Sequence, residues 1–240
     1  MILKKIILTI LFTTLLFGEN EFKKPESFKD YKQYILDDMM VFISPKLTKY
    51  LKIKEVKRDG YDKNIHAPVK TMFLTIKGEE LKLFIDPGAS DDFSFVFNHK
   101  GKERMIAGES VFISQSGTIY ISNRMNENYE VKRKFQITKS GVKELKQAFL
   151  SVNMDCETSA LATLYTEQGG KGTIVAKIPK GKKVKVLVNA FTAHNSELET
   201  DESKNYLVQT SFGLVGWVRS SAGYMQEKGK PLGCLMYEGD

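Results

Sequence analysis

A segment without charged residues lies close to the start of the chain. Lys4 and Lys5 precede the uncharged, mostly apolar run 6–17, and Gly18 follows as a small residue ahead of polar positions. A basic start, an apolar run of this length and a small residue at its end are typical of a secretory signal peptide, predicted here over residues 1–18. The run is shorter than the roughly 20 apolar residues that a membrane-spanning helix needs. A buried N-terminal strand or helix is the alternative interpretation.

The segment after the predicted signal peptide has its apolar residues at the spacing of a helix. Large apolar residues recur about every 3.6 positions over 28–42, behind Ser27 as a candidate helix cap. A second short helix is predicted over 44–51, because proline suits the first helical position and Pro45 stands there. A lysine-rich polar connector is expected to fill the stretch up to Pro68.

From Val69 the spacing changes to two. Apolar and polar positions alternate through a hairpin whose turn is 77–80. Further strands are predicted in the segments 93–97, 111–113, 118–122 and 129–137, and a short helix over 142–152. Residues 19–150 are therefore predicted to form an α+β domain, with helices followed by an antiparallel β-meander.

Composition narrows the class of partner. The formal net charge of the 240 residues is +7, yet only five of the 36 basic residues are arginine, at positions 58, 104, 124, 133 and 219. Arginine makes the bidentate contacts used on phosphates and bases, so nucleic acid is not the expected partner. A lysine-rich surface on an exported protein favours attraction to anionic envelope polymers or lipid headgroups. Solvated charge without a partner is the alternative.

The second half of the chain carries a set of ordered motifs. Strands are predicted at 162–165 and 174–178. Residues 179–187 (PKGKKVKVL) and 213–218 (GLVGWV) follow, separated by the strand 206–210. In order and spacing these segments resemble the bacterial SH3 (SH3b) family over about residues 158–221. The resemblance implies an SH3-like β-barrel, here residues 153–240 with a C-terminal tail, in an exported or wall-associated protein.

The chain departs from that family at three places. Leu164-Tyr165 stands where many members carry an arginine, and Asn205 stands where a tryptophan often precedes the fourth strand. The central loop 189–204 is longer than usual and acidic.

The resemblance also implies where ligands bind. Ligands of SH3-like barrels usually meet the loops that correspond here to 166–173 and 189–204. The aromatic residues nearest these loops, together with the tryptophan of the closing strand, are the candidate binding residues: Tyr165, Phe191, Tyr206, Phe212 and Trp217. Aromatic rings offer large contact areas at small entropic cost. For Trp217 the sequence predicts core packing as well, so its truncation is expected to unfold the barrel.

The two cysteines, Cys156 and Cys234, bracket the barrel segment. An even number in an oxidising compartment indicates one disulfide. The segment 154–158 is faintly similar to the Asp-Cys-Ser motif of NlpC/P60 peptidases. A thiol nucleophile needs a nearby imidazole, however, and only His194 follows Cys156.

No catalytic residue, metal ligand set or cofactor motif is assigned. The three histidines are far apart in sequence, and Asp86, Asp91 and Asp92 lack the regular spacing of a calcium loop. The SH3b resemblance implies a non-enzymatic periplasmic or secreted envelope protein, whose SH3b-like region binds peptidoglycan peptides or a protein partner. A hydrolase with its site in residues 19–150, or an inhibitor or secretion partner, is the alternative.

Overall fold

The computed structural model describes residues 24–57, 68–88, 93–123, 128–190, 203–221 and 230–235. The described chain is nearly all β, with short 3-10 helices between strands. Its elements are η1 (Glu26–Phe28), β1 (Lys32–Leu36), β2 (Met39–Ile43), η2 (Pro45–Tyr50), β3 (Lys52–Lys57), β4 (Pro68–Ile76), β5 (Glu79–Asp86), β6 (Ser94–His99), β7 (Lys102–Ala107), β8 (Ser110–Ile113), β9 (Thr118–Asn123), β10 (Val131–Thr138), β11 (Gly141–Glu144), β12 (Phe149–Glu157), β13 (Ala162–Glu167), η3 (Gln168–Gly170), β14 (Lys171–Ile178), β15 (Lys183–Ala190), β16 (Ser203–Thr210), β17 (Val215–Ser221) and η4 (Gly233–Leu235).

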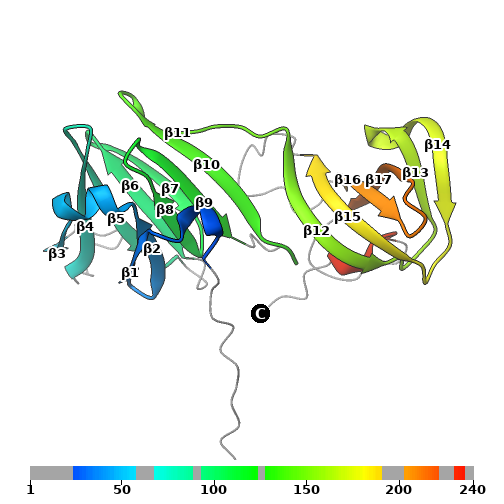
Figure 1. Cartoon of the computed structure of the whole chain (residues 1–240), viewed down its shortest axis with the longest axis horizontal. Helices are drawn as coiled ribbons and strands as arrows, with labels where there is room; N and C mark the ends of the chain where they lie inside the picture. The colour runs from blue at the N-terminus through cyan, green and yellow to red at the C-terminus, as the bar shows by residue number, and fades with distance from the viewer. Residues whose placement is uncertain are drawn as a thin grey trace, which may run out of the picture.

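Three sheets organise these strands (Figure 1). The first sheet has the order β1-β2-β8-β9-β10-β11, and the second has the order β3-β4-β5-β6-β7. The third sheet contains all the later strands in the order β12-β15-β16-β17-β13-β14. Neighbouring strands pair antiparallel except β2 and β8, which pair parallel.

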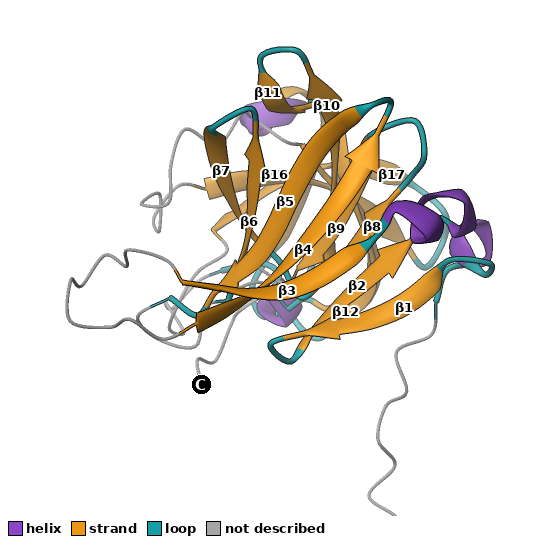
Figure 2. Cartoon of the chain, turned by 90° about the vertical axis from the view of Figure 1, so that its left-hand side faces the viewer, coloured by secondary structure: helices purple, strands orange, loops and turns teal. Residues whose placement is uncertain are grey.

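The first two sheets pack face to face around one core (Figure 2). Val41 and Phe135 of the first sheet and Leu83 and Phe97 of the second belong to the same buried cluster. In β5, β6 and β10 alternate side chains point into this core, as the period of two in the sequence predicts. The N-terminal region is therefore a two-sheet sandwich.

The predicted α+β class is wrong for this region. Residues 28–42, predicted as a helix, form mostly β1 and β2, joined by a turn at Asp37 and Asp38. Both turn residues have positive φ, 45° and 66°, the backbone of a two-residue hairpin turn. Both faces of β2 are covered, so its sequence is a continuous apolar run without alternation, and such a run is ambiguous between helix and strand.

Two further predictions in the N-terminal half have different outcomes. The helix predicted over 142–152 is wrong, because this segment lies in β11, β12 and their connection. The short helix predicted over 44–51 is present as η2, where Leu47 is buried, and the predicted connector after it contains β3.

The third sheet curls around a second core of its own (Figure 1). Its strands match the segments predicted from the sequence, and β12 adds one more at the edge. The sheet begins at Phe149, so the predicted boundary between 150 and 153 falls inside β12.

The two regions share buried side chains. Val131, the first residue of β10, and Tyr129, just before it, belong to the core of the third sheet. The buried amide of Asn189 in β15 donates a 2.9 Å hydrogen bond to the hydroxyl of Tyr129. The sandwich therefore contributes part of the packing of the C-terminal region.

Candidate functional site

The strands of the third sheet alternate between core and surface. Leu164, Tyr206, Val208 and Val218 are buried in its core. Because successive side chains of a strand point to opposite faces, the residues between them lie on the outer face. Trp217 is one of these: it is half-buried and stands beside Val218 on β17.

Strand pairing aligns five apolar residues across this outer face. In register, Val188 lies opposite Leu207, Leu207 opposite Trp217, Trp217 opposite Tyr165, and Tyr165 opposite Ile174. Directly paired residues share a face, with Cβ atoms about 5 Å apart. We call these five residues the aromatic row; it crosses β15, β16, β17, β13 and β14.

One more ring extends the aromatic row. The Phe149 ring at the start of β12 lies 5.9 Å from the Trp217 ring, centroid to centroid. Phe149 is 46% exposed and Ile174 is 47% exposed, whereas Tyr165 and Trp217 are half-buried. In the part of the chain that the structure describes, the row is therefore partly exposed to solvent, most of all at Phe149 and Ile174.

A glycine allows the two central strands of the row to approach each other. A Cβ atom on Gly216 would lie 2.9 Å from Cβ of Leu164 and 3.1 Å from the carbonyl oxygen of Tyr165. Real side chains do not tolerate the first distance, so only glycine fits here. The GLVGWV motif thus positions Trp217 beside Tyr165.

The structure separates the five predicted binding residues. Tyr165 and Trp217 are cross-strand partners in the aromatic row. Tyr206 is fully buried in the core, so it is not available to a ligand in the folded chain. Phe212 lies in the turn between β16 and β17 and is 87% exposed. Phe191 and most of the predicted ligand loop 189–204 lie outside the described residues.

Trp217 requires a correction of its own. The sequence predicts it as part of the barrel core, but the structure places it on the outer face, packed against Phe149. The side chains that fill the core from β17 include Val218 instead. Truncation of Trp217 should therefore affect the surface more than the fold.

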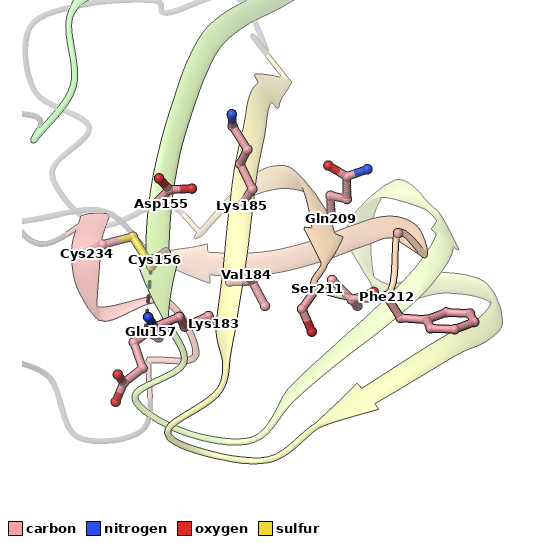
Figure 3. A pocket seen from close by; sticks show the side chains of 12 residues that line it. Asp155, Cys156, Glu157, Lys183, Val184, Lys185, Gln209, Ser211, Phe212 and Cys234 are labelled. Atoms are coloured by element: carbon pink, nitrogen blue, oxygen red, sulfur yellow. Dashed lines mark hydrogen bonds between the residues drawn. A yellow bond between two sulfur atoms is a disulfide. The ribbon is translucent and has the colours of Figure 1, made fainter.

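A cavity of about 680 Å³ borders the third sheet (Figure 3). Asp155 and Glu157 of β12, Lys183 and Lys185 of β15, and Phe212 contribute to its wall. In the pairing register Asp155 lies opposite Lys185, which lies opposite Gln209. Because Gln209 is two positions from Leu207 on β16, this polar line runs next to the aromatic row.

The two cysteines form part of the cavity wall. Cys156 and Cys234 are joined by a disulfide with an S–S distance of 2.02 Å, as predicted from the sequence. The bond ties the C-terminal segment to β12. Leu232 and Leu235, on either side of Cys234, are fully buried in the second core.

Sequence reasoning missed several members of this surface. Leu207, Val188 and Ile174 were placed in strands but not on a ligand-facing surface. Phe149 lies inside the segment 142–152 that was wrongly predicted as a helix. The alternation of Leu150, Val152, Met154 and Cys156 was the signal that could have identified β12 and so placed Phe149 on a strand.

Other classes of site find no support in the described part of the chain. Among its residues no group of three or more His, Cys, Asp or Glu could hold a metal ion. None of its helices has the length and hydrophobicity to cross a membrane. A second cavity of about 170 Å³ lies on the first sheet beside Phe28, Phe112 and Tyr120, and its lining is mostly apolar.

Comparison with known proteins adds no relative. No protein-family model, curated protein or solved structure matches the chain. The SH3b resemblance therefore stays a prediction that rests on the motifs themselves.

Proposed function

We propose that this chain is an exported envelope protein that binds peptides on the outer face of its third sheet. The observation that carries the proposal is the open aromatic row, in which strand pairing brings together Tyr165 and Trp217. Side chains of this size are usually buried, and a contiguous open apolar surface marks an interaction site. The SH3b resemblance of residues 158–221 supports the same region as the binding module.

The size of the row suits an extended peptide. Five adjacent strands at about 4.8 Å spacing give a length of roughly 19 Å, which an extended peptide of about six residues covers. Tyrosine and tryptophan provide large, rigid contact areas with few torsions to fix on binding. The stem peptides of peptidoglycan or a segment of an envelope protein would supply this chemistry.

Two features support export. The Cys156–Cys234 disulfide suits an oxidising compartment. The predicted signal peptide gives a route to that compartment, although residues 1–18 lie outside the described residues. A periplasmic or secreted location is therefore part of the proposal.

Binding to purified peptidoglycan and to envelope extract tests the proposal. We expect the purified protein to be retained by at least one of these, and Trp217→Ala or Tyr165→Ala to weaken retention about tenfold, a typical effect of losing an aromatic anchor. Leu161→Ala is the matched control, because Leu161 is also exposed, at 62%, but lies outside the aromatic row and the cavity. Retention by neither material, or equal retention of all variants, would contradict the proposal.

A further inference from the structure

The wall of the 680 Å³ cavity carries two pairs of opposite charges. Asp155 lies opposite Lys185, and Glu157 lies opposite Lys183. Both carboxylates are on β12 and both ammonium groups are on β15. The negative charges therefore lie along one strand and the positive charges along its neighbour. The four groups leave this part of the wall with no net charge but with strong local polarity.

These charges do not neutralise one another by direct contact. Among the described residues, none of the four takes part in an ion pair within 4.0 Å, although each faces an opposite charge across the strands. The carboxylates and ammonium groups are therefore available for a ligand that carries both signs. A ligand with one sign only would meet repulsion from half of the set.

Phe212 contributes an exposed ring to the cavity wall. Phe212 lies in its wall and is 87% exposed, an unusual position for a phenylalanine without a partner surface. Figure 3 shows the ring projecting from the turn after β16, away from the β12 and β15 strands that carry the charges. A volume near 680 Å³ falls within the range of small-molecule sites.

We propose that this cavity binds a short zwitterionic peptide through its free ends. Lys185 holds the carboxylate and Asp155, its cross-strand partner, holds the ammonium group. The inference rests on the proposed function, because it assumes that the natural ligand is a peptide. It adds a second, shorter peptide ligand, whose two free ends are close enough together to bind to neighbouring strands beside the aromatic row.

Calorimetric titration of the full chain with dialanine tests the inference. Three forms of the probe are compared: the free dipeptide, its N-acetyl form and its C-terminal amide. We expect the two blocked forms to bind about tenfold more weakly, since each loses one charged end. The Lys185→Gln variant should bind the free dipeptide only as weakly as the unchanged chain binds the amide. The Asp155→Asn variant should bind it only as weakly as the unchanged chain binds the N-acetyl form.

Two control variants keep the charge change but leave the cavity intact. Lys180→Gln and Glu109→Gln each remove an exposed charge outside the cavity wall, so they should bind dialanine as the unchanged chain does. No binding of free dialanine, or equal binding of all three forms, overturns the inference.

A further comparison separates this inference from the proposed function. Trp217→Ala should reduce retention on envelope material while leaving dialanine binding within about twofold, because Trp217 is not in the cavity wall. If the chain binds envelope material through Trp217 but never binds dialanine, the cavity inference fails and the proposed function stands. If dialanine binds but Trp217→Ala changes nothing on envelope material, the proposed role of the aromatic row fails instead.

Discussion

Two regions of the molecule carry a row of aromatic side chains on the outer face of a sheet, and the two rows differ in how far they are buried. On the first sheet, Phe42 pairs with Phe112, and Phe112 pairs with Tyr120. The η1 segment covers this row, because the Phe28 ring stacks 4.4 Å from the Phe112 ring. Phe112 is 3% exposed under this ring, and Phe42, which stacks on Phe112, is 0% exposed. On the third sheet, Tyr165 and Trp217 of the aromatic row are half-buried, and Ile174 is 47% exposed.

The difference indicates which row is structural and which is available for binding. Burial of a phenylalanine side chain contributes roughly 1.5–3 kcal/mol, so a chain gains stability by covering such a row. The N-terminal region obtains that gain with a three-residue 3-10 helix. Within the described residues the C-terminal row lacks such a cover, which leaves its apolar area for a ligand.

The largest expected effect on stability tests whether the two rows differ in their structural role. Phe112→Ala removes a buried ring and should lower the free energy of unfolding by about 3–5 kcal/mol. Trp217→Ala removes a half-buried surface ring and should cost about 1 kcal/mol. Urea unfolding followed by circular dichroism measures both. Equal losses in the two variants would show that the Trp217 row is as structural as the covered one.

The two regions also differ in how their ends are held together. The C-terminal region uses the Cys156–Cys234 disulfide, which spans a sequence separation of 78. The double variant Cys156→Ala/Cys234→Ala should lower the free energy of unfolding by about 2–5 kcal/mol, because the cross-link restricts the unfolded chain. The same loss should follow when the unchanged chain is unfolded under reducing conditions. An unchanged urea midpoint under reduction would mean that the disulfide contributes little.

Much of this architecture could be predicted from the sequence, and the failures have physical causes. The alternation in β4, β5, β13, β15, β16 and β17 reflects one buried face and one solvated face, so the sequence shows a period of two. In β2 both faces are covered, by the core at Val41 and by Phe112 and Lys24 at Phe42, so β2 shows no alternation. Local spacing then favoured a helix that the sandwich does not contain.

The candidate site was predictable only in part for a similar reason. Tyr165 and Trp217 came from the SH3b motifs. Their neighbours Leu207 and Ile174 depend on strand register, which bulges shift between Leu164 and Tyr165 and between Val186 and Val188. A register shift of one residue moves a side chain to the other face, and the bulges left no clear sign in this sequence.

An ionic cluster connects the two sheets of the sandwich, whereas the C-terminal region is cross-linked by a covalent bond. Arg133 of β10 donates hydrogen bonds of 2.8 and 2.7 Å to the two carboxylate oxygens of Glu144 in β11. Arg104 of the second sheet lies 3.7 Å from the same carboxylate and donates to the carbonyl oxygen of Val142. Partial burial alone would raise the pKa of Glu144, but the hydrogen bonds and charges of the two arginines outweigh it and lower that pKa.

This cluster predicts a smaller, pH-dependent effect. Because the pKa of Glu144 is lower in the folded chain, its ionised form stabilises the fold above the ordinary value of 4.5, and this stabilisation is lost as the pH falls through the folded-state pKa. Glu144→Gln should therefore cost about 2 kcal/mol at pH 7. The difference from the unchanged chain should shrink as the pH falls below 4.5. Urea unfolding at a series of pH values measures it, and a difference that stays constant with pH would exclude the ionic role.

The smallest expected effect on stability comes from a substitution that uncovers the row on the first sheet. Phe28→Ala removes the ring that stacks on Phe112 and lies 5.1 Å from the Tyr120 ring, and it should cost about 1 kcal/mol. It should also expose the Phe112 surface and increase the fluorescence of a dye that binds apolar patches. Lys29→Ala in the adjacent turn is the control, because Lys29 pairs with Glu26 at the surface and does not cover the row. If Phe28→Ala leaves dye binding unchanged, then η1 is not what separates the two rows, and the open state of the Trp217 row loses its value as a sign of binding.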